Sequence, residues 1–306
     1  MALHHSTPLL ESLALSRRAQ TSVWLKMEAL QPSGSFKLRG VGHACTTHQA
    51  RGAKGFLSSS GGNAGLAVAH AGRKLGLPVR VVVPQTTSVR ALELLRQEGA
   101  ELIVHGASWQ EAHAHAQALQ RPDEAFIHPF DDPLLWEGHA SLVAEVAQAG
   151  FKPDAVVLSV GGGGLFSGVV HGLHQQGWTD VPVLAVETTG AASFNAALQA
   201  GCAVSLDAIH SVATSLGAKQ VCAEALRWAA QHPVQSHTVS DRQAVQACLN
   251  FLEDHRVLVE PACGASLALA DLPDRPLAAF GRVLMVVCGG ATATTSQLQD
   301  WARTLP

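Results

Sequence analysis

Two short segments of this 306-residue chain bring together residue types that could handle a phosphorylated aldehyde. Lys37 lies in the run Ser33-Gly34-Ser35-Phe36-Lys37-Leu38-Arg39-Gly40, where small neighbours would let an aldehyde approach and burial would lower the pKa of the amine. Gly161-Gly162-Gly163-Gly164 follows an apolar run, and its N–H groups can converge on a phosphate because no Cβ blocks them. Together the two segments predict a site for pyridoxal 5′-phosphate.

Each segment also has an ordinary interpretation. Lys37 would lie at the start of a helix running from Ser35 toward Thr46, with Ser33 or Ser35 as its N-cap, and most helix lysines are simply solvated. Phe36 could belong to the core or stack on a flat ring. A packing turn needs only one or two glycines, so four in a row favour a phosphate cradle. This run matches neither a Walker A loop nor a G-x-G-x-x-G fingerprint.

Two further segments stand at the expected ends of strands. Ser58–Gly65 opens a helix, whose unpaired N–H groups and positive dipole end could hold a carboxylate, while the Asn63 amide could reach a ring hydroxyl. A plain capped turn is the alternative for this loop. Cys288 follows the last apolar run, where it is either a small buried hydrophobe or a weak partner of a heterocyclic nitrogen.

Short β-branched runs alternate with helical stretches along the whole chain, which predicts an α/β protein with mostly parallel sheets flanked by helices. We expect two lobes, a small domain of residues 33–136 and a larger one of residues 1–32 with 137–306, and a ligand site beyond the carboxyl ends of the strands. The expected strands are Ser22–Lys26, Gly55–Ser58, Val79–Val83, Glu101–Val104, Ala125–Ile127, Ala155–Val160, Val181–Val186, His237–Val239 and Arg282–Val287.

Composition narrows the function classes. Apolar residues make up 47% and charged residues 15% of the chain, and the net charge is −3 without a basic stripe, so we expect no nucleic-acid partner. No apolar run is long enough for a transmembrane helix, and we expect no membrane partner. Six scattered cysteines and an N-terminus without signal-peptide character predict a reduced, cytoplasmic protein. The 16 histidines show no zinc-site spacing.

The motifs taken together resemble the fold type II pyridoxal-phosphate enzymes, whose fold is like that of tryptophan synthase β. The chain is most similar to the L-serine/L-threonine dehydratases, in the branch of serine dehydratase and serine dehydratase-like proteins. The resemblance runs almost from end to end. It is carried by Gln31–Lys37, Pro129–Ala140, Leu158–Leu165, Val259–Ala265 and Val287–Gly290.

The resemblance implies a role for each matching position. Lys37 would be the catalytic residue and hold pyridoxal phosphate as a Schiff base. The other implied cofactor contacts are Phe36, Asn63, Gly161, Gly162, Gly163, Gly164, Leu165, Ser215 and Cys288. The substrate carboxylate would lie on Ser60, Gly61, Gly62, Asn63 and Ala64. A monovalent cation, K⁺, would be held by Glu187, Ala191, Leu216 and Ala218.

The activity implied by the resemblance is α,β-elimination of water from L-serine or L-threonine. The aminoacrylate formed would give a 2-oxo acid, pyruvate or 2-oxobutanoate, and ammonia, and the enzyme would be a homodimer. Alternatives are a serine racemase, a dehydratase for bulkier β-hydroxy amino acids, and a non-catalytic protein that binds pyridoxal phosphate or amino acids. The chain departs from the expected pattern at Gly61, Ser215 and Ala291-Thr292, which bears on rate and substrate preference.

Overall fold

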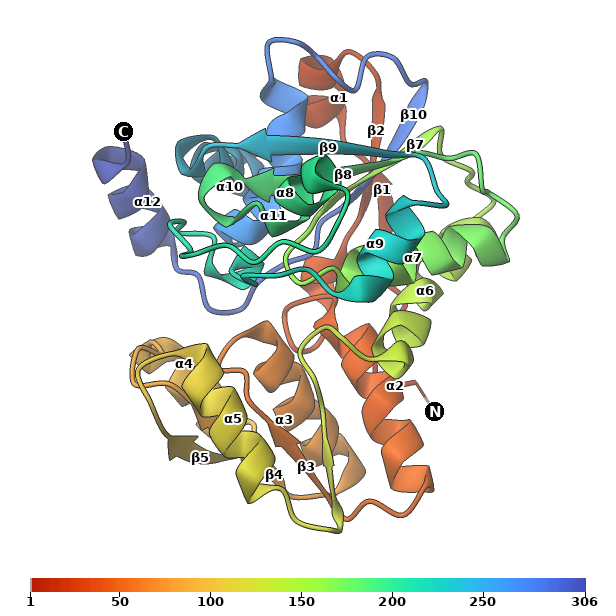
Figure 1. The fold of residues 1–306 in the computed structure, drawn as a ribbon. Helices are drawn as coiled ribbons and strands as arrows, with labels where there is room; N and C mark the ends of the chain where they lie inside the picture. Colours follow the sequence, from red (N-terminus) through yellow and green to blue (C-terminus); the bar gives the residue numbers. More distant parts are fainter. Residues whose placement is uncertain (1) are drawn as a thin grey trace.

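The computed structural model describes residues 2–306, which form two β-sheets with helices packed on their faces (Figure 1). The six-stranded sheet has the order β1 (Leu9–Glu11), β2 (Ser22–Lys26), β10 (Arg282–Val286), β7 (Ala155–Ser159), β8 (Val183–Thr188) and β9 (Val234–Val239). The four-stranded sheet has the order β5 (Glu101–Val104), β4 (Val79–Val83), β3 (Gly55–Ser58) and β6 (Glu124–Phe126). These sheets are the cores of the two expected lobes, whereas the domain boundaries at residues 33 and 136 stay a prediction.

Neighbouring strands pair in parallel except at one edge, where β1 runs antiparallel to β2. Parallel sheets need cover on both faces, and the strands accordingly read as continuous apolar runs. Val156, Val157 and Leu158 of β7 are fully buried. This central strand is therefore recognised in the sequence by its unbroken apolar residues. It lacks the apolar–polar alternation that marks a half-exposed strand.

The small sheet shows how successive side chains serve its two faces. Phe56 and Val81 pack in one apolar cluster with residues of helices α2 (Lys37–Ala50) and α3 (Asn63–Leu75). Leu57 and Val82, their neighbours in sequence, pack on the opposite face with helix α5 (Trp109–Leu119). In Figure 1 this lobe lies below the larger one. Ser60 and Pro84, which follow β3 and β4, line one cavity together with Gly161 and Cys288 of the larger lobe, so the carboxyl ends of these strands face that lobe.

The remaining helices follow the strand–helix alternation with short terminal shifts from the predicted bounds. They are α1 (Leu13–Ala19), α4 (Val89–Gln97), α6 (Pro133–Gln148), α7 (Gly164–Gln175), α8 (Ser193–Ala200), α9 (Ala223–Ala229), α10 (Asp241–His255), α11 (Pro261–Leu267) and α12 (Thr295–Thr304). Within residues 2–306 no helix has both the length and the apolar character needed to cross a membrane.

Two strands differ from the sequence prediction in an informative way. β9 begins at Val234, three residues before the predicted start, although Gln235, Ser236 and His237 are polar. It is an edge strand paired only with β8, so one side of it faces solvent and polar side chains are tolerated. β8 extends to Thr188, which places Glu187 inside the strand instead of just after it.

Candidate functional site

A cavity of about 890 Å³ lies between the two lobes, beyond the carboxyl ends of β3, β4, β7 and β10. Open α/β sheets place ligand sites at this edge because the strand-to-helix loops converge there. The cavity is lined by all the residues predicted to contact cofactor or substrate: Phe36, Lys37, Ser60, Gly61, Gly62, Asn63, Ala64, Gly161, Gly162, Gly163, Gly164, Leu165, Ser215 and Cys288. The structure therefore gathers segments separated by more than two hundred residues in the chain.

Lys37 is the first residue of α2, and its amine points into the cavity. Its Nζ donates a hydrogen bond to the Pro129 carbonyl oxygen at 2.6 Å and lies 5.2 Å from the centre of the Phe36 ring. Burial lowers the pKa of the Lys37 amine to about 8, although the nearby Cys288 and Glu260 act in the opposite direction. A buried amine that loses its proton near neutral pH is a competent nucleophile and base.

Phe36 replaces the predicted serine N-cap of α2. The N-cap position is held by Phe36, without a side-chain cap, and the Ser33 and Ser35 hydroxyls have no hydrogen-bond partner among residues 2–306. The backbone is fixed instead by the turn that follows β10: the Phe36 N–H donates to the Cys288 carbonyl oxygen at 3.1 Å. The Phe36 ring also packs on His139 of α6, with the ring centres 5.0 Å apart.

The four glycines form a tight cradle at the start of α7. Gly163 is the N-cap with φ +91°, a conformation that favours glycine. A Cβ on Gly162 would lie 2.2 Å from the Phe130 ring, and one on Gly161 would lie 2.9 Å from the Ser215 carbonyl oxygen. Side chains would therefore collide with these neighbours, and the four glycines line the cavity at the N-terminus of α7. This arrangement fits the phosphate of pyridoxal phosphate.

The loop from Ser60 to Ala64 leads into α3, whose N-cap is Gly62. The Ser60 hydroxyl accepts a hydrogen bond from the Gly62 N–H at 3.3 Å, which orders the loop. A Cβ on Gly61 would lie only 2.7 Å from Cγ2 of Thr87. The room that glycine might have left for a larger substrate is therefore occupied by the Thr87 methyl group.

Cys288 is the second residue after β10 and is 6% exposed. A hydrogen bond with the Cys263 side chain, together with burial, raises the pKa of its thiol well above the ordinary value. Gly289 and Gly290 follow with φ +95° and +134°, so the chain turns sharply at this point. Cys288 therefore offers the cavity a neutral thiol.

Sequence reasoning assigned no role to Glu260, whose side chain also lines the cavity. It is 6% exposed, and its Oε1 accepts a hydrogen bond from Nδ2 of Asn63 at 2.7 Å. Burial raises the pKa of the Glu260 carboxyl to about 7. The only signal in the sequence is an acidic residue before Pro261, at the expected start of a helix inside the motif Val259–Ala265.

Comparison with known proteins agrees with this geometry. Residues 2–289 match the model of the family described as "Pyridoxal-phosphate dependent enzyme". The chain belongs to this family. It is 48% identical to the mouse protein named L-serine dehydratase/L-threonine deaminase, covering 97% of this chain and 94% of that one, and 50% identical to mouse serine dehydratase-like, covering 97% and 93%.

Solved structures give the same result. The fungal L-serine ammonia-lyase from Rhizomucor miehei superposes with a TM-score of 0.94 at 37% identity and covers 100% of both chains. The predicted family and its two-lobed α/β fold are thus confirmed, and pyridoxal phosphate is the cofactor of this pyridoxal-phosphate enzyme.

The predicted cation ligands divide between the cavity wall and the protein behind it. Leu216 and Ala218 line the cavity, whereas Glu187 of β8 and Ala191 are buried behind it. The Glu187 carboxylate accepts the backbone N–H groups of Phe194 and Asn195 at 2.8 and 2.7 Å, and so binds the N-terminal turn of α8. Burial raises the pKa of this carboxyl to about 7. No cluster of three or more histidine, cysteine or acidic side chains suited to a metal occurs within residues 2–306.

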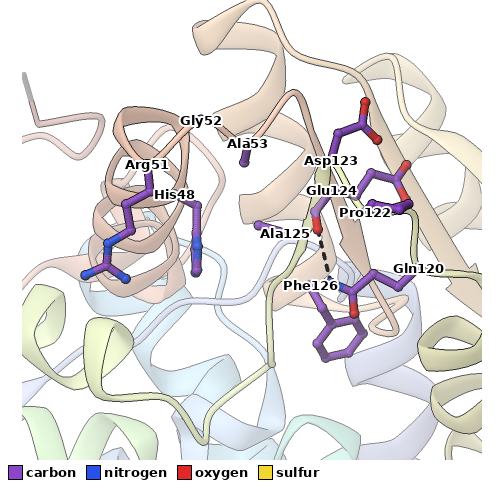
Figure 2. Close-up of a pocket in the computed structure, with 10 residues that line it drawn as sticks. All are labelled: His48, Arg51, Gly52, Ala53, Gln120, Pro122, Asp123, Glu124, Ala125 and Phe126. Atoms are coloured by element: carbon purple, nitrogen blue, oxygen red, sulfur yellow. Dashed lines mark hydrogen bonds between the residues drawn. The ribbon is translucent and has the colours of Figure 1, made fainter.

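A second, open cavity of about 400 Å³ lies at the amino-terminal edge of the small sheet (Figure 2). Its walls come from the segment after α2, including His48 and Arg51, and from residues around the start of β6, including Asp123. None of the residues with predicted chemistry lines it. The inter-lobe cavity is therefore the candidate active site of this pyridoxal-phosphate enzyme.

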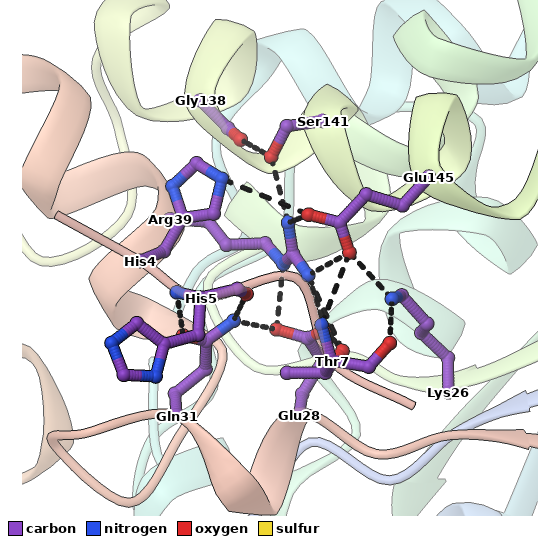
Figure 3. Close-up of polar contacts among 10 residues, drawn as sticks. All are labelled: His4, His5, Thr7, Lys26, Glu28, Gln31, Arg39, Gly138, Ser141 and Glu145. Carbon is purple, nitrogen blue, oxygen red and sulfur yellow. Dashed lines mark hydrogen bonds and ion pairs between the residues drawn. The ribbon is translucent and has the colours of Figure 1, made fainter. Parts of the chain in front are cut away.

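A buried ion network holds α2, and with it Lys37, against the large lobe (Figure 3). The Arg39 guanidinium pairs with Glu28 at 2.7 and 2.8 Å and with Glu145 of α6 at 2.7 Å on both nitrogens. The Lys26 amine also pairs with Glu145, and the Thr7 hydroxyl donates to Glu28 at 2.6 Å. Two cations therefore face two carboxylates, and one of the cations, Arg39, lies two residues after Lys37 in the sequence.

Proposed function

We propose that this protein is a pyridoxal-phosphate-dependent lyase that eliminates water from L-serine and L-threonine. The released aminoacrylate or its methyl homologue then hydrolyses, taking up one water, to pyruvate or 2-oxobutanoate and ammonia. The observation that carries the proposal is the convergence of the buried Lys37 amine, the glycine cradle and the α3 N-terminus in one cavity. The names of the mouse and fungal relatives support the same substrate class.

Each group has a chemical task in this proposal. The N–H groups at the start of α3 bind the α-carboxylate of the amino acid, and Gly161 to Gly164 bind the cofactor phosphate. When bound, the cofactor supplies an electron sink for the pair left at Cα. Lys37 takes the Cα proton, because burial keeps a large fraction of its amine neutral near pH 8. The neutral Cys288 thiol holds the ring nitrogen more weakly than a carboxylate would, which favours prompt loss of the β-hydroxyl.

A direct assay tests the proposal. We expect the purified protein to carry the cofactor's visible absorbance and to form 2-oxo acid from L-serine and L-threonine, and Lys37→Ala to abolish turnover. A coloured protein without turnover would support the non-catalytic binding alternative. Interconversion of L- and D-serine at a rate above 2-oxo acid formation would support a racemase, for which Ser215 is the nearby hydroxyl. The Ser215 Oγ accepts a hydrogen bond from the Asn63 amide at 3.3 Å.

We also propose that K⁺ binds Glu187 with the carbonyl oxygens of Ala191, Leu216 and Ala218. Oxygen ligands with a single carboxylate suit a large monovalent ion. A cation would offset the burial that disfavours the Glu187 charge and would fix the Leu216 segment in the cavity wall. We expect K⁺ to raise activity and Tm above their values in Li⁺, and Glu187→Gln to weaken this response. Equal activity and Tm in both salts would exclude the cation.

The proposal extends to the organisation of the protein. We propose a small domain of residues 33–136, within which all four strands of the small sheet fall, and a cytoplasmic homodimer. Sedimentation velocity at several protein concentrations tests the dimer, and cell fractionation tests the location. Limited proteolysis with cleavage near residues 32 and 136 tests the domain boundaries.

A further inference from the structure

The Glu260 side chain makes a hydrogen bond to Asn63 across the boundary between the lobes. Glu260 precedes α11 in the large lobe, and Asn63 is the first residue of α3 in the small lobe. The bond from Asn63 Nδ2 to Glu260 Oε1 is 2.7 Å long and buried. Gly290 makes room for it, because a Cβ there would lie 2.3 Å from Cγ and Cδ of Glu260. The carboxyl is thus held between a glycine turn and the Asn63 amide.

Neither helix capping nor an ion pair explains why a carboxyl group is buried at position 260. Glu260 occupies the N-cap position of α11, yet its side chain makes no capping hydrogen bond. No arginine, lysine or histidine forms an ion pair with it among residues 2–306. The nearby Lys37 charge lowers the pKa of the Glu260 carboxyl, but burial outweighs it, so keeping this carboxyl buried is costly. An apolar side chain would fill the same space at lower cost. The carboxyl therefore serves something other than the stability of α11.

The hydrogen bonds of the Asn63 amide indicate what the Glu260 carboxyl does. An amide has a donor end and an acceptor end of nearly equal size, and only its hydrogen bonds decide which way it faces. The Ala291 N–H donates to Asn63 Oδ1 at 3.1 Å, while Nδ2 donates to Glu260 and, at 3.3 Å, to the Ser215 hydroxyl. In its ionised form the Glu260 carboxylate can only accept, and the Ala291 N–H can only donate, so the two contacts together exclude the flipped amide.

We propose that Glu260 is a positioning residue that fixes the Asn63 amide with its nitrogen toward the acceptors of the active-site cavity. This inference rests on the proposed function and on the contact with the cofactor's ring hydroxyl that the sequence predicts for Asn63. One Nδ2 hydrogen of Asn63 is donated to Glu260, so the second, which donates to the Ser215 hydroxyl at the longer distance of 3.3 Å, is the one that can be given to a ring oxygen. The oxygen of a flipped amide could not donate at all. The same bond holds the first turn of α3, where the substrate carboxylate is expected to bind, against the large lobe.

Two substitutions at one position separate this role from a structural one. Glu260→Met fills the volume but cannot accept a hydrogen bond, and Glu260→Gln retains an oxygen that can accept from Asn63. We expect Glu260→Met to keep or raise Tm while weakening pyridoxal phosphate binding about tenfold, and Glu260→Gln to stay within about threefold of the wild type. Cofactor affinity is measured by fluorescence titration of the cofactor-free protein.

A double-mutant cycle with Asn63→Ala decides whether Glu260 acts through Asn63. If it does, Glu260→Met adds less than about a twofold loss of affinity on the Asn63→Ala background. Asp154→Ala is the matched control: this large-lobe carboxylate binds the Arg282 N–H at 2.7 Å at the opposite edge of the sheet, so it should leave affinity unchanged in both backgrounds. The inference would be overturned if the double variant lost affinity by the product of the two single fold losses. It would also be overturned if Glu260→Met bound pyridoxal phosphate as tightly as the wild type. Either result leaves the proposed function intact, because that function is tested separately by 2-oxo acid formation in the wild type.

Discussion

The protonation of Lys37 decides whether the active site can remove a proton from Cα. Its amine lies among apolar atoms and one carbonyl oxygen, and burial outweighs the opposing influence of Cys288 and Glu260. Burial disfavours the charged ammonium, so the pKa of Lys37 falls below that of an exposed lysine. The side chain is then partly neutral at the pH of a cell, as a base must be.

This environment predicts a rising pH profile. Below about pH 8 the Lys37 amine is protonated and cannot accept the Cα proton, so kcat with L-serine should rise about tenfold per pH unit and level off above about pH 8. Steady-state assays between about pH 6 and 9.5, on protein whose cofactor absorbance confirms full occupancy, measure the profile. A kcat that falls with increasing pH across this range would contradict the role of Lys37 as base.

The space in which an alanine at position 61 would place its methyl group is already filled by neighbouring side chains. A Cβ at Gly61 would approach Cγ2 and Oγ1 of Thr87 to 2.7 and 3.1 Å and Cγ1 of Val83 to 3.2 Å. Gly61→Ala should therefore lower the free energy of unfolding by about 1 kcal/mol through overpacking. Thr87→Ser removes the methyl group closest to the new Cβ.

We expect Thr87→Ser to recover at least about half of that loss in the Gly61→Ala protein, and the paired variant to exceed Gly61→Ala in kcat/KM for L-serine. Denaturant unfolding of the four proteins measures the coupling. If the changes in the free energy of unfolding of the two single variants simply add in the double variant, the loop moves to accommodate the new Cβ and the Cβ does not contact Thr87.

At the scale of elements, α2 is positioned by charge as well as by apolar packing. Arg39 is fully buried and bonds Glu28 of the short 3-10 helix Glu28–Leu30 on one side and Glu145 of α6 on the other. Removing one partner of a buried ion network leaves unpaired charges that water cannot reach. The position of Lys37 at the start of α2 therefore depends on a network that lies outside the cavity.

Arg39→Ala should destabilise the protein by about 3 to 5 kcal/mol, because the Glu28 and Glu145 carboxylates lose their main partner. The exposed Arg227, which pairs with Glu224 three residues away, is the matched control, and Arg227→Ala should cost less than about 1 kcal/mol. Chemical unfolding monitored by circular dichroism measures both. If both substitutions lowered the free energy of unfolding by the same small amount, water or a rearrangement of the protein would be compensating the Glu28 and Glu145 charges.

The sequence predicted those elements whose local pattern is unambiguous. Continuous apolar runs marked β7 and β10, and glycine-rich turns marked the starts of α3 and α7. It did not predict β1, three residues long with mainly exposed side chains, or the start of β9, where edge-strand residues alternate with no clear apolar face. Short edge strands depend on pairing with a neighbour, and that information is not local.

The same limit applies to the site. Lys37, the glycine run and the Asn63 loop carry their chemistry in local composition, and the structure brings them into one cavity. Glu260 has an ordinary helix-start sequence, and its importance depends on Asn63 nearly two hundred residues earlier in the chain. The Ser33 and Ser35 cap was wrong because the turn after β10, and not a side chain, orders the start of α2.

At the scale of the whole molecule, the active site joins two lobes that each have their own core. Backbone contacts cross between them at the start of α2, where the Gly290 N–H donates to the Gly34 carbonyl oxygen at 2.9 Å, and Asn63 adds the bond to Glu260. A ligand that contacts both walls of the cavity adds further bonds between the lobes. Its binding energy therefore stabilises the molecule as one unit.

We expect pyridoxal phosphate to raise the Tm of the cofactor-free protein by about 4 °C at a hundredfold excess over Kd, which corresponds to about 2.7 kcal/mol. Both lobes should then unfold in one transition, because the cofactor contacts the Lys37 and Asn63 side as well as the Gly161–Gly164 side. Pyridoxal without phosphate is the control: it lacks the group that the glycine cradle fits, so its shift should be smaller at the same concentration. Differential scanning calorimetry resolves these cases. Two separate transitions, only one of which moves with cofactor, would show that the ligand is held by a single lobe.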